Sequence, residues 1–177
     1  FGHGAELAPL EASFWIGSDG KELFLAVVSE TPPGGKLLAR FVPLPDDHDA
    51  RTWLDDSIEL VLAPEPRAPA GSCRLYHAIL NANGAVHDTL YVLGGNAAVW
   101  RGRWRTASKI IGDRWHFELA LPLADLGLPK GLPPGSPLGV RVGRNWQQTP
   151  VASQTEWSPR GGAYLERETL PLVAWDE

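Results

Sequence analysis

Short turn signals, each lying between two apolar runs of strand length, dominate this sequence. Asp19-Gly20, Asn83-Gly84 and Gly112-Asp113 have the composition of tight β-hairpin turns. The flanking runs are rich in Val, Ile, Phe and Trp and show almost no helical periodicity. Because a tight hairpin places its two strands antiparallel, this feature predicts a fold built from antiparallel sheets.

The runs that we expect to form strands are residues 12–17, 21–30, 36–43, 57–63, 73–81, 85–93, 104–111, 114–122, 137–146 and 168–175. The best helical candidate is 122–128, which ends beside Gly127, and the 19 Gly and 16 Pro favour turns over helices. The pattern predicts one all-β domain over residues 1–177. We expect an antiparallel β-sandwich, jelly-roll or immunoglobulin-like, with one short helix. Residues 1–12 are expected to be a loose lead-in.

Composition excludes several function classes. A net charge of −5 and the lack of a basic run argue against nucleic-acid binding. No apolar run approaches the ~18 residues of a membrane span. The single cysteine, Cys73, excludes an internal disulfide and a four-thiolate zinc site. The lack of any Met leads us to expect a processed protein or a module cut from a longer one.

Residues 53–62 combine a strand with an unusual polar lead-in. Alternation predicts that one face enters the core, with Leu54, Ile58, Leu60 and Leu62. The other face then carries Trp53, Asp55, Ser57 and Glu59. A tryptophan beside carboxylates on an accessible surface is a candidate recognition site.

The eight tryptophans fall into different contexts. Trp15, Trp115 and Trp175 lie in apolar strand patterns and are expected in the core. Trp53 and Trp157 lie in polar, loop-like contexts, which makes them candidates for recognition, and Trp146 is intermediate.

Catalysis is not expected. Glycosidases need two carboxyl groups roughly 5–9.5 Å apart, whereas Asp55 and Glu59 on one extended strand would lie about 13 Å apart. No GxSxG motif is present. A two- or four-residue loop at Asn83-Gly84 pairs Leu80 with His87, which puts His77 and His87 on opposite faces. This pairing, together with the lack of Met, disfavours a haem-binding electron-transfer domain.

Five aspartates lie close together in the sequence, at Asp46, Asp47, Asp49, Asp55 and Asp56. Carboxylate oxygens are the ligands that calcium prefers, but the spacing matches no EF-hand loop. A solvated acidic turn and a calcium site both remain open.

Four stretches carry a family resemblance when taken in order. They are "WLDDSIELVLAP" (53–64), "YHAILNANGAVHD" (76–88), "WHFELALPLADLG" (115–127) and "QTEWSP" (154–159). The series resembles the family 9 carbohydrate-binding modules and their relatives. The resemblance implies an antiparallel β-sandwich that holds a sugar, without hydrolysing it, between two tryptophan side chains.

The resemblance also implies roles for particular residues. Trp53 matches the first stacking tryptophan and Glu59 the hydroxyl-binding acid, while Trp157 is the best match for the second tryptophan, with Trp146 as the alternative. Asn145 and Arg141 fall where polar sugar contacts are expected. The Arg and Asn that family members carry before the "NANG" turn are replaced here by Tyr76 and Ala78. Family members often hold structural calcium, for which the five aspartates are the candidates.

The expected function is therefore that of a non-catalytic carbohydrate-binding module. It would be extracellular or periplasmic, covalently attached to other domains of a secreted protein or enzyme, and would target that protein to polysaccharide. The alternatives are a structural β-sandwich without sugar binding and a haem-binding electron-transfer domain.

Overall fold

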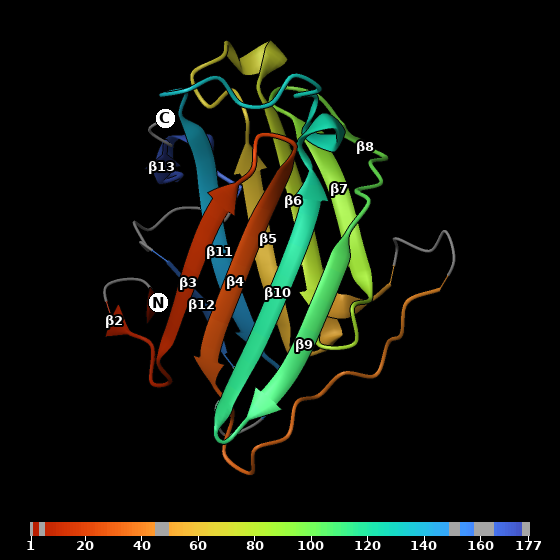
Figure 1. The fold of residues 1–177 in the computed structure, drawn as a ribbon, viewed down its shortest axis with the longest axis vertical. Helices are drawn as coiled ribbons and strands as arrows, with labels where there is room; N and C mark the ends of the chain where they lie inside the picture. The colour runs from red at the N-terminus through yellow and green to blue at the C-terminus, as the bar shows by residue number, and fades with distance from the viewer. Residues whose placement is uncertain (1, 4–5, 45–49, 149–152, 158–164, 175–177) are drawn as a thin grey trace.

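The computed structural model describes residues 2–3, 6–44, 50–148, 153–157 and 165–174. Within these ranges the strands form two antiparallel sheets that pack face to face (Figure 1). The smaller sheet has the order β3-β4-β10-β9. Its strands are β3 (Ala12–Ser18), β4 (Glu22–Glu30), β10 (Arg114–Pro122) and β9 (Arg105–Ile111).

The larger sheet has the order β2-β1-β12-β11-β5-β6-β7-β8, and β13 pairs with β11. Its central strands are β11 (Leu138–Trp146), β5 (Ser57–Ala63), β6 (Arg74–Asn81) and β7 (Val86–Val92). Its shorter strands are β1 (Gly2–His3), β2 (Glu6–Leu7), β8 (Ala97–Ala98), β12 (Ser153–Glu156) and β13 (Leu172–Val173). Two residues of β1 and two of β2 thus lie within the expected lead-in.

The core lies between the two sheets. Alternate residues of the long strands point inward, as strand geometry requires. They include Leu23, Leu25, Val27, Ile58, Leu60, Leu62, Trp115, Phe117, Leu119, Val140 and Val142. The sandwich predicted from the hairpin pattern is confirmed, as is the inward face of residues 114–122.

Helical structure among the described residues is limited to short 3-10 turns. They are η1 (Thr52–Leu54), η2 (Ala70–Ser72), η3 (Leu123–Leu126) and η4 (Arg167–Thr169). The short helix expected near 122–128 is η3, and Gly127 ends it in the left-handed conformation, φ +76°.

Several predictions about elements and burial are wrong. Of the described residues in the strand expected at 168–175, only Leu172–Val173 are strand, because the chain turns in η4 at Arg167–Thr169. Residues 36–43 form no strand, because the amides of Leu38, Arg40 and Phe41 donate to aspartate side chains instead of to a neighbouring strand. Trp15 is 60% exposed, because it lies on the solvent face of β3. Leu54 is exposed because η1 interrupts the alternation that was extended back from β5. Trp175 lies outside the described residues.

Candidate functional site

Glu59 lies on the outer face of the larger sheet, away from the core. On β5 it is paired with Gly143 of β11 on one side and with Ile79 of β6 on the other. Because Gly143 has no side chain, the space beside Glu59 stays open towards Asn145 and Gln154, which are register partners on β11 and β12.

Three side chains hold the Glu59 carboxylate. His77 Nε2 lies 2.7 Å from Oε1, while Asn145 Nδ2 and Gln154 Nε2 donate to Oε2 at 2.9 and 3.0 Å. The partners come from three different strands, and Glu59 is only 6% exposed. Hydrogen bonds to an ionised acceptor are the strong ones, and a network with several members fixes each side chain in one orientation. The carboxylate is therefore preorganised before any ligand arrives.

Trp53 lies beside this carboxylate on η1, which Asp55 and Asp56 connect to β5. Thr52 anchors η1, because its hydroxyl donates to the Ile79 carbonyl at 2.8 Å. The Trp53 ring meets His87 at 4.9 Å with an interplanar angle of 79°, and the residue is 42% exposed. An indole that makes an edge-to-face contact with a neighbouring ring and is open to solvent presents apolar surface to a ligand.

Trp53 and Glu59 share one open hollow of about 460 Å³. Its other lining residues are Ile79, Asn145, Trp146, Gln147 and Gln154. The volume of the hollow falls in the range of small-molecule sites, and its lining combines one aromatic ring with amide and carboxylate groups. The hollow offers an apolar surface and hydrogen-bonding groups to the same ligand.

Asp55 and Asp56 organise the loop beside the hollow. Asp55 accepts from the Arg40 and Phe41 amides, from Arg40 Nε and from Asn81 Nδ2, at 2.8–3.1 Å. Burial opposes its ionisation, but the hydrogen bonds from Asn81, Phe41 and Arg40 outweigh burial, so the pKa of the Asp55 carboxyl lies below its ordinary value.

Asp56 also holds this loop by accepting hydrogen bonds. It accepts from the Leu38 and Gln147 amides and from Gln148 Nε2, at 2.7–2.8 Å. Since Gln147 also lines the hollow, Asp56 ties the loop, η1 and the end of β11 together. Asp55 and Asp56 together fix the loop beside Trp53 through these contacts.

The calcium expectation names five aspartates, Asp46, Asp47, Asp49, Asp55 and Asp56. Asp46, Asp47 and Asp49 lie outside the described residues. Among the residues that are described, no group of three or more His, Cys, Asp or Glu side chains is arranged to hold a metal ion. Asp55 and Asp56 face N–H donors, which a cation would have to displace. Structural calcium stays a prediction.

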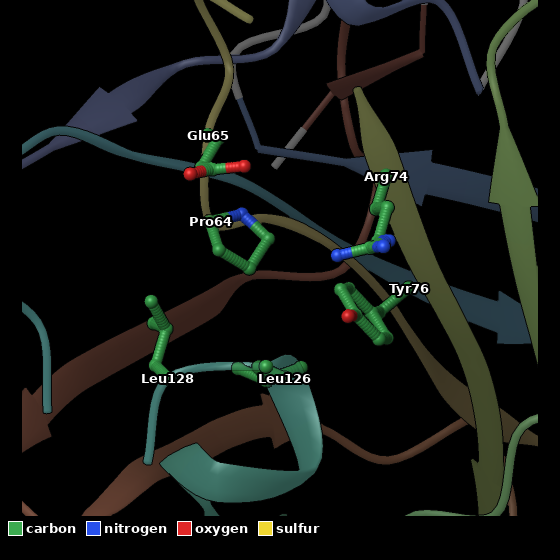
Figure 2. A pocket seen from close by; sticks show the side chains of 7 residues that line it. Pro64, Glu65, Arg74, Tyr76, Leu126 and Leu128 are labelled. Carbon is green, nitrogen blue, oxygen red and sulfur yellow. The ribbon is translucent and has the colours of Figure 1, made fainter. Parts of the chain in front are cut away.

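A second, smaller cavity lies at one end of the sandwich, where η3 approaches β6 (Figure 2). Its volume is about 90 Å³, and its lining includes Glu65, Arg74, Tyr76 and Leu126. Burial raises the pKa of the Tyr76 hydroxyl. The cavity is too small for a pyranose ring and does not include Glu59 or Trp53.

Solved structures of other proteins share the fold of this chain. A protein from Bacteroides uniformis, described as carbohydrate-binding, superposes with a TM-score of 0.70 at 15% identity, over 93% of this chain and 78% of the other. A family 9 carbohydrate-binding module from Caldicellulosiruptor kristjanssonii, solved with glucose and with cellotriose, gives TM-scores of 0.63 and 0.64 at 14% identity. These two alignments cover 96% and 97% of this chain and 78% of the other.

The chain has the fold of a family 9 carbohydrate-binding module. No family model matches the sequence. No curated protein matches it either.

On this carbohydrate-binding-module fold, only part of the expected site comes together. Trp53, Glu59 and Asn145 line one hollow. Trp146 borders it, but its ring packs in the core against Trp115 at 5.7 Å, and the residue is 1% exposed. Arg141 shares the outer face with Glu59 but is buried, with Nε 2.9 Å from Glu156 Oε2 and Nη2 donating to the Thr169 hydroxyl at 2.6 Å.

Trp157 is placed away from the hollow. It follows β12, where Gln154 points to the Glu59 side, so a residue three positions later points to the opposite side. Its ring meets Phe14 of β3 at 5.0 Å with an interplanar angle of 70°. Phe14 packs against the core between the sheets. In this arrangement the Trp157 indole does not face Trp53.

Three polar residues of the site were not predicted from the sequence: His77, Gln147 and Gln154. The cause for His77 is the loop at Asn83-Gly84, which holds three residues and has Gly84 at φ +83°. His87 therefore pairs with Ile79 rather than with Leu80, and His77 and His87 share the outer face. By the same parity Tyr76 and Ala78 point into the core, so the position that contacts the acid is His77.

Proposed function

We propose that this chain binds carbohydrate in the hollow between Trp53 and Glu59. The observation that carries the proposal is the pairing of a half-exposed indole with a carboxylate that three side chains hold in place. A pyranose needs both elements, because its C–H groups form apolar faces while its hydroxyl groups project from the ring edge. The likeness in fold to a module solved with glucose and with cellotriose supports a glucosyl unit as the ligand.

The magnitudes are consistent with weak, reversible binding. One sugar face can bury ~100 Å² against Trp53, which contributes about 2.5 kcal/mol at ~25 cal/mol/Å². Hydrogen bonds to Glu59, Asn145 and Gln147 add to this, and the loss of translational and rotational freedom offsets several kcal/mol. We expect a Kd between ~10 μM and ~1 mM.

The grip that the described geometry favours uses one indole and a polar wall. Trp53 supplies the stacking face, and Asn145, Gln147 and Gln154 surround the acid. A grip by two tryptophans would require the Trp157 ring to leave Phe14. That second plate is therefore kept as a prediction to be tested separately.

We also propose that the chain is an accessory module without hydrolytic activity. Glu59 is the one carboxylate among the described residues that line the hollow, whereas glycoside hydrolysis uses two. A module of this kind would serve a larger secreted protein by holding it on polysaccharide. No helix among the described residues has the length and hydropathy to cross a membrane.

Isothermal calorimetry with cellotriose and with glucose tests the site. Trp53→Ala should weaken cellotriose binding roughly 30- to 150-fold, the equivalent of ~2–3 kcal/mol. Glu59→Gln should weaken it less, about tenfold, because the amide keeps one acceptor while the charge-assisted bond is lost. Thermal melting of each variant checks that the fold is intact.

Glu65→Gln is the matched control, since Glu65 is an exposed carboxylate beside the small cavity at the end of the sandwich. Its affinity should equal that of the wild type. Wild-type protein that gives no binding heat with either sugar would overturn the proposal and favour a structural β-sandwich. Wild-type affinity in Trp53→Ala would move the site elsewhere.

A further inference from the structure

The smaller sheet carries an aromatic hollow on its own outer face, on the side of the sandwich opposite Glu59. Trp15 of β3 is 60% exposed and Phe24 of β4 is 38% exposed. Together with Gly17, Ala26 and Glu118 they line an open hollow of about 380 Å³. Strand pairing fixes this group, and none of its residues takes part in the Trp53 hollow.

The register shows how the hollow is formed. Ala26 lies between Trp15 and Glu118 across three strands, and Phe24 is paired with Gly17. Strands are ~4.8 Å apart, so the Cα atoms of Trp15 and Glu118 lie about 10 Å apart with only a methyl group between them. Trp15 and Phe24 are diagonal neighbours, about 7–8 Å apart. Gly17 and Ala26 are small, so they leave an open surface on which a sugar ring can lie. This surface lies between the Trp15 indole and the Glu118 carboxylate.

We propose that this hollow is a second carbohydrate-binding site, which takes a pyranosyl unit of a polysaccharide chain. Trp15 stacks on the C–H face of the ring, Phe24 contacts its edge, and the Glu118 carboxylate accepts hydrogen bonds from hydroxyl groups. The site does not depend on the proposed function of the Trp53 hollow, because the two share no residue.

The exposed area fits a sugar better than a protein partner. An aromatic side chain presents 150–250 Å², so the exposed parts of Trp15 and Phe24 amount to roughly 200 Å². A stable protein interface needs ~800 Å² on each side. A single pyranose face covers ~100 Å², which matches one plate. Glu118 lies next to the apolar floor, where it would be costly in a protein interface core but suits a hydroxylated ligand.

Two sites on opposite outer faces have a mechanical consequence. The two sheets pack face to face around the core (Figure 1), and each hollow lies on the outer face of its own sheet. One module could then hold two polysaccharide chains at once, or gain avidity on an insoluble surface where both faces find ligands. The Trp53 hollow alone would dominate binding of a short soluble sugar.

Gly17 provides a sharp probe of this hollow. No heavy atom lies within 4 Å of the position that a Cβ would take there, and the backbone of Gly17 does not have a positive φ. Gly17→Val should therefore be tolerated by the strand, and should project methyl groups into the space that the ring would occupy. This variant blocks the hollow while both aromatic side chains stay in place.

Depletion binding to insoluble cellulose, performed on full-length variants in the Trp53→Ala background, tests the proposal. Trp53→Ala should retain measurable adsorption, and adding either Gly17→Val or Trp15→Ala should reduce the partition constant at least tenfold. Ile111→Ala is the control, since Ile111 is exposed on the same sheet but does not line the hollow. It should leave adsorption unchanged.

The outcomes separate the two sites. Adsorption by the wild type that Trp53→Ala abolishes, and that Gly17→Val and Trp15→Ala leave unchanged, would overturn the second site and leave the first intact. Adsorption that only the smaller-sheet variants reduce would support the second site and count against the first. Loss of self-association in Trp15→Ala, measured by sedimentation, with unchanged adsorption would make this face a contact between copies and contradict the proposal.

Discussion

At the residue scale, the Glu59 carboxylate is held in one orientation by side chains of the neighbouring strands. His77, Asn145 and Gln154 bring three donors to its two oxygens, and each donor rises from a different strand. These hydrogen bonds hold the carboxylate in one orientation at the hollow that it shares with Trp53. The same arrangement explains why a buried acid is tolerated on this face, since its charge is met by hydrogen bonds.

Trp157 carries the clearest single-residue prediction. Its ring packs against Phe14, so Trp157→Ala should remove an aromatic contact of about 1 kcal/mol together with buried area, and should lower the melting temperature by several degrees. Cellotriose affinity should stay within about threefold of the wild type. Calorimetry and thermal melting of this variant give both numbers.

The Trp157→Ala variant also shows whether one tryptophan or two stack on the sugar. A loss of affinity above about 30-fold with an unchanged melting temperature would show that Trp157 stacks on the sugar, as the family resemblance implies. Trp157→Phe serves as the matched substitution, because it retains an aromatic ring against Phe14 and should restore most of the stability.

At the element scale, the segment before η1 is held by side chains rather than by a sheet. Residues 36–43 have the composition of a strand, but the Asp55 and Asp56 carboxylates accept the amides of Leu38, Arg40 and Phe41. Asn81 and Asn83 add bonds to the Phe41 carbonyl at 2.8 and 3.1 Å. Sequence propensity could not show this, because the competing acceptors lie about fifteen or more residues further along the chain.

Acidification should weaken the hydrogen bonds by which Asp55 holds the segment before η1. The pKa of Asp55 is depressed in the folded state, so its contribution to stability is fully present above its ordinary pKa of ~3.9 and is lost as pH falls through the lowered value. Asp55→Asn should cost about 2 kcal/mol at neutral pH, because an amide nitrogen then faces N–H donors. Melting curves of wild type and variant should converge between about pH 5 and pH 2.

Asp113→Asn provides the comparison for this pH series, since the Asp113 side chain is 85% exposed and Arg114 Nε lies 3.9 Å from its carboxylate. Its melting temperature should follow that of the wild type at every pH. A constant gap between wild type and Asp55→Asn from pH 7 to pH 2 would contradict the role given to the Asp55 charge.

At the scale of the whole molecule, the sandwich places one aromatic hollow on each outer face and an apolar core between the sheets. A buried arginine crosses this core, because Arg144 points inward from β11 and donates to the Ser29 hydroxyl of β4 at 2.7 Å. Burial lowers its pKa to about 10, against the pull of Glu30. Arg144 therefore stays charged at neutral pH and links the sheets behind the Glu59 hollow.

Features that depend on residues close together in the sequence were predictable, and features that depend on residues far apart in the sequence were not. Hairpin turns and alternation are local, so the strands around Asp19-Gly20 and Gly112-Asp113 and the β-sandwich were predictable. The pair Trp53 and Glu59 lies within one short motif and was predictable too. His77 depended on one residue of loop length at Gly84, and Gln154 on the pairing of β12 with β11, neither of which a single sequence reveals.

A sugar bound in the hollow between Trp53 and Glu59 can be located by an NMR titration of ¹⁵N-labelled protein with glucose. We expect saturable shifts of the Trp53 indole N–H and of the Asn145 and Gln154 side-chain amides, with the buried Trp115 indole unchanged. Saturable shifts confined to other residues, or no shifts at glucose concentrations far above ~1 mM, would contradict it.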